Sequence, residues 1–176
     1  MNQQSLLPRR PVPALRVPLL GGGRFVLGAE PGEHFDLLVF YRGLHCPICA
    51  KYLLELARLK DDFAQRGVAI LAVSSDTEER AAAMAEKVPG LRFGYGLNLH
   101  SARQWGLYIS AGRGKTSINL EEPALFSEPG VFLVRPDGTL YYGAVQTMPF
   151  ARPGFADLLG AVDFVIAKDY PARGEA

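Results

Sequence analysis

The stretch Phe40-Tyr41-Arg42-Gly43-Leu44-His45-Cys46-Pro47-Ile48-Cys49 contains both cysteines of the chain, three residues apart. It overlaps the end of an unbroken apolar run, residues 37–41, which is typical of a central strand buried on both faces. After the cysteines, apolar residues recur every three or four positions, which predicts an amphipathic helix over residues 47–66. Two thiols at this spacing on the first helical turn lie on one side of it, within reach of a disulfide. The stretch therefore predicts a dithiol redox site between a strand and a helix.

The composition narrows the class of protein. The chain has 176 residues, 48% of them hydrophobic and 21% charged, which predicts one domain with an ordinary core. A net charge of +1 gives no electrostatic reason to expect binding to nucleic acid or to a membrane surface. Two cysteines are too few for a secreted disulfide framework, and they indicate catalytic or metal-binding thiols in a reducing compartment. A metal site would need two further ligands, and no suitable spacing supplies them, so we expect neither metal nor cofactor.

The N-terminal region predicts no export signal. Prolines flank Arg9-Arg10, and no apolar segment follows the pair. No window reaches the roughly 18 consecutive apolar residues that a membrane span needs. We therefore expect a cytoplasmic protein.

The remaining pattern predicts a βαβ half followed by a ββα half. Residues 1–14 are expected to form an extended arm, and residues 15–176 a single domain. The expected elements of that domain are a hairpin over 15–27, the strand 37–41, the helix 47–66, a parallel strand over 68–73, a helix over 77–88 capped by Ser75 or Asp76, a strand over 91–97, a short helix over 101–105, a long loop over 110–128, a hairpin of 131–134 with 140–144, and a C-terminal helix after Gly154. This order is that of a thioredoxin-like three-layer α/β sandwich, with a central mixed sheet and helices on both faces. The cysteines then lie at the carboxyl end of a central strand, where open α/β sheets place their active sites.

Several segments resemble one known family. Residues 41–49, 73–77, 132–138, 148–153 and 170–174 resemble, in this order, the Cys-x-x-Cys-bearing, peroxiredoxin-like branch of the alkyl hydroperoxide reductase/thiol-specific antioxidant family. The resemblance implies the same fold and an antioxidant thiol chemistry.

The sequence also departs from the peroxiredoxin signature at several positions. Peroxiredoxins carry a Pro-x-x-x-Thr-x-x-Cys signature and a distant arginine that together orient the peroxide. With Cys49 at the peroxidatic position, Cys46 replaces the threonine, Arg42 replaces the proline, and Pro129 stands where the arginine is expected. Thioredoxins have a cis-proline there, so the resemblance indicates a cis-Pro129 beside the cysteines; an ordinary trans turn proline is the alternative.

The positions of the two thiols relative to the first helical turn predict different roles for them. Cys46 precedes the first turn, where free backbone N–H groups and the helix dipole stabilise a thiolate, so we expect Cys46 to attack and Cys49 to resolve. Two inert core thiols are the alternative interpretation. His45 is expected either to lower the thiol pKa as a protonated neighbour or act as an acid/base, or to point to solvent. Arg42 is expected either to pair with a thiolate or an anionic substrate, or to cover the strand end.

Three functions remain open on this basis. We favour a thiol-disulfide oxidoreductase that cycles a Cys46–Cys49 disulfide. A thiol-dependent, peroxiredoxin-like peroxidase is the first alternative, and a non-catalytic redox sensor or interaction module is the second. The expected partners are an external thiol reductant of thioredoxin or glutathione type and a protein disulfide or peroxide substrate, and a homodimer is allowed.

Overall fold

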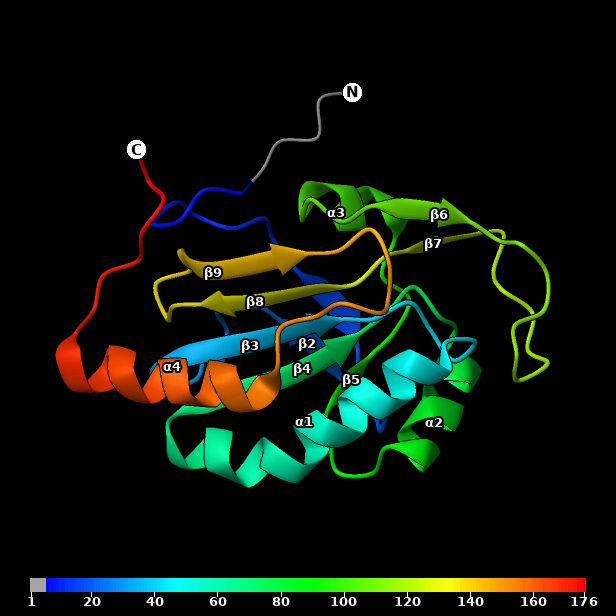
Figure 1. Cartoon of the computed structure of the whole chain (residues 1–176), viewed down its shortest axis with the longest axis horizontal. Coiled ribbons are helices and arrows are strands. Elements are labelled where there is room, and N and C mark those ends of the chain that lie inside the picture. The colour runs from blue at the N-terminus through cyan, green and yellow to red at the C-terminus, as the bar shows by residue number, and fades with distance from the viewer. Residues whose placement is uncertain (1–5) are drawn as a thin grey trace.

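The computed structural model describes residues 6–176, and its centre is a mixed sheet with strand order β5-β4-β3-β8-β9 (Figure 1). Strand β3 pairs parallel to β4 and antiparallel to β8. The elements of the sheet are β3 (Phe35–Phe40), β4 (Val68–Val73), β5 (Phe93–Gly94), β8 (Gly130–Val134) and β9 (Leu140–Val145). The helices are α1 (Pro47–Gln65), α2 (Glu78–Lys87), α3 (Leu99–Gln104) and α4 (Phe155–Lys168). The predicted thioredoxin-like α/β fold is confirmed.

The apolar run that predicted a central strand does form one. All six residues of β3 are buried, and its five apolar side chains are divided between two separate cores. Leu37 and Val39 join a core that contains residues of α1, α2 and α4, whereas Leu38 and Phe40 join a core that contains residues of α3 and the hairpin β1 (Arg16–Pro18)–β2 (Arg24–Val26). Because both faces are covered, neither face of the strand needs polar residues.

Helix α1 begins directly at the cysteines. Cys46 is its N-cap residue and Pro47 occupies the first turn, where a missing N–H breaks no helical hydrogen bond. The helix ends at Gln65, and Gly67 follows with φ of +66°, a conformation that favours glycine. The predicted strand–helix boundary therefore lies where the sequence placed it.

Two predictions of local structure are wrong. Residues 110–128 are not a simple loop, because β6 (Ile109–Ala111) pairs antiparallel with β7 (Leu125–Ser127). Strands of three residues are too short to show an alternating pattern, and they form here by pairing with each other. The cap of α2 is Thr77, whose hydroxyl accepts a hydrogen bond from the Arg80 N–H, and neither Ser75 nor Asp76.

The cap of α2 gives a direct test of stability. Replacing Thr77 with alanine removes the acceptor and should lower the free energy of unfolding by about 1 kcal/mol. Replacing Ser75 with alanine should cost nothing, because its buried hydroxyl has no hydrogen-bond partner among the described residues. Chemical denaturation of both variants measures the difference, and an equal loss in the two would contradict the assignment of the cap.

The described part of the expected N-terminal arm lies against the sheet. The Arg9 N–H donates to the Leu140 carbonyl, and the Leu140 N–H donates to the Arg10 carbonyl, at 2.8 and 2.9 Å. These bonds cover the start of the edge strand β9. Residues 1–5 of the arm lie outside the described residues. Within residues 6–176, no helix is both long and apolar enough to cross a membrane.

Candidate redox site

The two cysteines meet at the start of α1 as free thiols. The Cys49 N–H donates to the Cys46 Sγ at 3.2 Å, so the sulfur of Cys46 is the side-chain cap of the helix. Both residues are buried in the core, with exposed fractions of 2% for Cys46 and 0% for Cys49. The predicted stabilisation of Cys46 by the first helical turn is therefore present in the geometry.

The loop before α1 is anchored by Asp76, which lies between β4 and α2. Gly43 has φ of +142°, and a Cβ there would lie 2.9 Å from the Asp76 carboxylate oxygens. The next residue, Leu44, donates its N–H to the Asp76 Oδ2 at 2.7 Å. Asp76 also accepts from the Arg80 Nε at 3.0 Å, which satisfies its buried charge. This close approach fixes the backbone that leads into Cys46.

The surroundings of the two thiols shift their pKa values in opposite directions. The hydrogen bond with the Cys49 thiol is the largest influence on Cys46, and together with the Cys49 N–H it lowers the pKa of Cys46 to about 6. Burial and the neighbouring Cys46 raise the pKa of Cys49 well above its usual range. At neutral pH the pair therefore carries its negative charge mainly on Cys46, which makes Cys46 the stronger nucleophile.

Arg152 is the residue that sequence reasoning missed. Its Nη2 donates to the Cys49 Sγ at 2.9 Å, its Nε donates to the Pro149 carbonyl at 2.8 Å, and its guanidinium lies 4.8 Å from the centre of the Tyr52 ring. The Arg152 charge lowers the pKa of both thiols, although it is not the largest influence on either. Its only signal in the sequence is its place in the segment 148–153 of the family resemblance.

Arg42 is held by acids from the β6–β7 hairpin. Its Nη2 lies 3.5 Å from the Glu122 Oε1, and its Nε lies 3.4 Å from the Glu128 Oε2. Its guanidinium also covers the ring of Phe126, at 4.7 Å from the ring centre. Arg42 still contributes to the low pKa of Cys46, but two carboxylates share its charge.

His45 is neither a cation nor directed to solvent, and its expected acid/base role stays a prediction. Its side chain is buried rather than directed to solvent, and its ring packs on Phe126 with 4.7 Å between ring centres. Burial, followed by the charge of Arg42, lowers the pKa of His45 to about 4, so the ring is neutral at pH 7. A neutral imidazole cannot lower the thiol pKa as a cation would.

The expectation of a cis-Pro129 is wrong. Within the described residues 6–176, every peptide bond is trans. Pro129 precedes β8, where Gly130 pairs with Phe40 at the end of β3, and its carbonyl accepts from the Gln146 N–H at 3.0 Å. It is a trans residue at the entry of a strand, which is the lower-energy form of an X–Pro bond.

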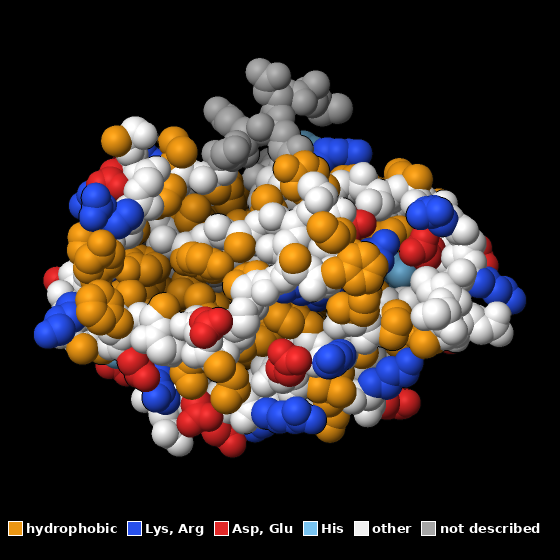
Figure 2. Space-filling model, in the orientation of Figure 1, with side chains coloured by type: hydrophobic (Ala, Val, Ile, Leu, Met, Phe, Trp, Pro, Cys, Tyr) orange, Lys and Arg blue, Asp and Glu red, His pale blue; other side chains and the backbone are white. Residues whose placement is uncertain are grey.

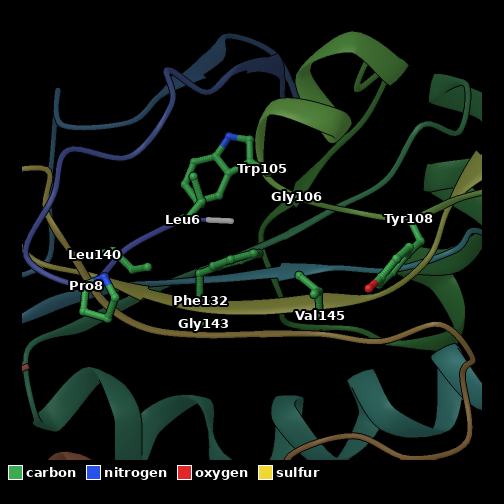
Figure 3. Close-up of a pocket in the computed structure, with 9 residues that line it drawn as sticks. All are labelled: Leu6, Pro8, Trp105, Gly106, Tyr108, Phe132, Leu140, Gly143 and Val145. Atoms are coloured by element: carbon green, nitrogen blue, oxygen red, sulfur yellow. The ribbon is translucent and has the colours of Figure 1, made fainter. Parts of the chain in front are cut away.

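The cavity drawn in Figure 3 is separate from the cysteines. It has a volume of about 390 Å³, and the residues that line it include Trp105, Phe132 and Leu140. These three residues belong to the core on the opposite face of β3 from the cysteines. Among the described residues, no group of three or more His, Cys, Asp or Glu side chains is arranged to hold a metal ion.

Comparison with known proteins decides the family. The AhpC/TSA family model matches residues 8–143, which is most of the chain. The chain belongs to the AhpC/TSA family. No curated protein sequence matches this AhpC/TSA member.

Solved structures share its fold at low sequence identity. The peroxidoxin BcpB from Mycobacterium tuberculosis superposes with a TM-score of 0.70 at 19% identity, covering 92% of this chain and 98% of that one. The AhpC of Mycobacterium tuberculosis gives 0.72 at 14% identity, covering 94% and 96%. The mitochondrial 2-Cys peroxiredoxin from Plasmodium falciparum gives 0.72 at 16% identity, covering 93% and 96%. At these identities the superpositions establish a common fold for this AhpC/TSA protein.

Proposed function

We propose that the protein is a thiol-dependent peroxidase that uses Cys46 and Cys49. Membership in the AhpC/TSA family supports an oxidoreductase. This proposal reverses the order of preference drawn from the sequence, where a general thiol-disulfide oxidoreductase came first. That order depended on three departures from the peroxiredoxin signature, at Arg42, Cys46 and Pro129. The structure supplies an arginine for the third of them, whereas the proline and the threonine of the signature are still replaced by Arg42 and Cys46.

The observation that carries the proposal is the position of Arg152. The sequence placed Pro129 where a peroxide-orienting arginine is expected, but the fold brings the Arg152 Nη2 to 2.9 Å from the Cys49 Sγ. The site therefore combines a thiol of low pKa with a fixed cation at the neighbouring sulfur. A cation there favours the negative charge that the attacking sulfur carries before each step.

The burial of the thiols supports a small substrate. With exposed fractions of 2% and 0%, neither sulfur of the reduced pair is open to a disulfide on the surface of a second protein. A hydroperoxide needs only two oxygen atoms to reach Cys46. This difference in size favours peroxide over a protein disulfide as the oxidising substrate.

The proposed reaction has two steps on this chain. The Cys46 thiolate attacks one oxygen of the hydroperoxide, the O–O bond breaks, and the departing oxygen takes a proton to leave as an alcohol or water. Cys46 is then a sulfenic acid. The Cys49 thiolate attacks the Cys46 sulfur, hydroxide leaves as water with one proton, and the Cys46–Cys49 disulfide forms. An external thiol reductant supplies the two electrons that restore both thiols.

Rapid-mixing kinetics with a peroxide and with a protein disulfide test the proposal. Hydrogen peroxide should oxidise the reduced pair on the order of 10²–10³-fold faster than it oxidises free cysteine, since one well-placed electrostatic contact typically contributes this much. The disulfides of insulin should be reduced slowly by comparison. Peroxide oxidation no faster than that of free cysteine would overturn the proposal, and rapid insulin reduction would restore the disulfide oxidoreductase.

A further inference from the structure

His45 is held in one tautomer by Arg80 of α2. The Arg80 Nη2 lies 3.5 Å from the His45 Nδ1, and the Arg80 Nε donates to the Asp76 carboxylate at 3.0 Å. A guanidinium donates hydrogen bonds and accepts none, so the His45 Nδ1 is the acceptor and the imidazole proton lies on Nε2. The pair of Asp76 and Arg80 therefore orients the ring and decides which of its nitrogens is a donor.

The donor at Nε2 is buried and has no acceptor. The exposed fraction of His45 is 0%, and its Nε2 has no hydrogen-bond partner among residues 6–176. Most buried polar groups in proteins are hydrogen-bonded, because an unpaired one is costly, and a role in the reaction is one reason for which proteins keep an exception. The unpaired Nε2–H is therefore a candidate for a contact that forms only during the reaction.

The two acids near His45 are occupied by other donors. Glu122 accepts from the Arg113 N–H at 2.7 Å and pairs with Arg42 at 3.5 Å. Glu128 accepts from the Ser110 hydroxyl at 2.6 Å and pairs with Arg42 at 3.4 Å. Figure 2 shows basic and acidic side chains close together at the end of the molecule that carries the β6–β7 hairpin. These interactions leave the His45 donor available for an oxygen of the substrate.

His45 and Cys46 belong to one turn. The Cys46 N–H donates to the Gly43 carbonyl at 3.1 Å, so residues 43–46 form a turn that ends with these two side chains. The Arg42 charge lowers the pKa of both His45 and Cys46, which places its guanidinium near each of them. The His45 ring and the Arg42 guanidinium also pack on the same Phe126 ring, each 4.7 Å from its centre. The imidazole therefore lies beside the proposed nucleophile.

We propose that the His45 Nε2–H donates a hydrogen bond to the oxygen that departs when Cys46 attacks a hydroperoxide, which makes His45 a further catalytic residue. The inference rests on the proposed function, and it assigns a donor to a charge for which that function names none. The imidazole keeps its proton throughout, so it acts neither as a cation nor as a general acid.

The reaction creates the acceptor for this donor. The Cys46 thiolate attacks the protonated oxygen of HO–OR, where R is hydrogen or an alkyl group, the O–O bond breaks, and the other oxygen leaves as RO⁻ with the electron pair. Negative charge on that oxygen grows in the transition state, and a donor that is already fixed stabilises it without reorganisation. RO⁻ then takes a proton from solvent to become ROH, and Cys46 is a sulfenic acid.

The surroundings keep the imidazole neutral while the thiol ionises. Burial, followed by the charge of Arg42, lowers the pKa of His45 to about 4, and Arg80 acts in the same direction. Asp76 and Glu122 oppose this shift but do not cancel it. Since the pKa of Cys46 is about 6, His45 is a neutral donor at every pH at which the thiolate is abundant.

Two variants at His45 separate its donor from the rest of the side chain. His45→Leu keeps a side chain of similar volume but has no N–H, whereas His45→Gln keeps one. The rate of Cys46 oxidation by hydrogen peroxide is measured across the thiol titration by rapid quenching and mass spectrometry. His45→Leu should lower the plateau of this pH profile roughly 10²-fold, the usual effect of removing one such donor, and leave its midpoint unchanged. His45→Gln should recover most of the plateau.

Two controls distinguish this effect from a structural one. Iodoacetamide alkylates the same thiolate without releasing an oxygen, so its rate should be equal in wild type and His45→Leu. His34→Leu removes a histidine at the other end of β3, where the His34 Nδ1 lies 3.0 Å from the Arg66 carbonyl oxygen, and it should leave the peroxide rate unchanged.

The tautomer of His45 is measured without peroxide. Nitrogen NMR of the reduced protein should show the His45 ring protonated at Nε2 and not at Nδ1, with no titration around the usual histidine pKa of about 6.5. A proton on Nδ1, or a ring that titrates there, would overturn the inference independently of the peroxide rate.

Four kinetic outcomes also contradict the inference. These are equal plateaus in wild type and His45→Leu, a plateau in His45→Gln as low as that in His45→Leu, an equal slowing of peroxide and iodoacetamide, and a loss that a shifted midpoint explains in full. A wild type that reacts with peroxide no faster than free cysteine loses the proposed function and this inference with it. A fast wild type with an unaffected His45→Leu variant loses the inference alone.

Discussion

Replacing Cys46 with serine should lower the rate of peroxide consumption on the order of 10³-fold or more, because it removes the nucleophile. A serine hydroxyl is not ionised at neutral pH, whereas the hydrogen bonds at the helix start lower the pKa of the Cys46 thiol to about 6. Peroxide consumption is followed in a coupled assay with excess thiol reductant. Mass spectrometry of the peroxide-treated variant should show no oxidised Cys49 on the time scale of wild-type turnover.

Two variants at Cys49 are the matched controls. Cys49→Ser keeps a hydrogen-bond donor beside Cys46 but cannot resolve, so Cys46 should accumulate as a sulfenic acid with one added oxygen. Cys49→Ala also removes the donor that contributes most to the low pKa of Cys46, so its first oxidation step should be slower than that of Cys49→Ser at pH 7. Rapid oxidation of Cys49 in the Cys46→Ser variant would contradict these roles, and it would make Cys49 the attacking thiol, in line with its position in the resemblance.

Replacing Arg152 with methionine should raise the pKa of the Cys46 thiol by about one to three units, the usual effect of removing a nearby opposite charge. The thiolate absorbs near the ultraviolet edge of the protein spectrum, so its midpoint is measured by a pH titration of the reduced protein. Wild type should gain thiolate as the pH rises through about 6, and the variant only at higher pH. At pH 7 the variant should therefore react with peroxide about 2- to 90-fold more slowly, because the thiolate fraction falls from about nine tenths to between about one half and one hundredth.

Arg152→Lys tests whether the thiol pKa depends on the positive charge of Arg152 or also on the geometry of its guanidinium. Lysine keeps the positive charge but cannot donate to both Pro149 and the Cys49 sulfur from one planar group, or stack on Tyr52 in the same way. Its thiol pKa should lie between those of wild type and Arg152→Met. A midpoint in Arg152→Met equal to that of wild type would show that Arg152 has no electrostatic role at the thiols.

The predictions that agree with the structure depend on interactions between residues that are close together in the sequence. The run before Arg42 predicted a strand buried on both faces, and β3 is one. Pro47 and the repeat of apolar residues after it predicted α1 to within one residue of its observed end. The placement of Cys46 before the first turn predicted its hydrogen bond to a free helical N–H. Each of these predictions depends on residues within a few positions of one another, and their order along the chain was sufficient for the fold class.

The errors concern contacts between distant segments. The acids that hold Arg42 come from residues 122 and 128, in a hairpin whose short strands have no pattern of their own. His45 was expected to be a cation, an acid/base or solvent-exposed, yet its side chain is buried against Phe126 of β7. Pro129 was assigned by analogy to a thioredoxin position, and its trans peptide bond shows that the analogy does not extend to this residue.

The sequence by itself determined that two thiols lie at the start of a helix after a buried central strand, because periodicity and helix capping are local. Only the tertiary structure decided which charges surround those thiols. Arg152 is 103 positions from Cys49 in the chain, and nothing local to either residue requires them to meet. Their contact depends on how β9, α4 and α1 pack, and that packing brings to the thiols an arginine that local sequence patterns did not indicate.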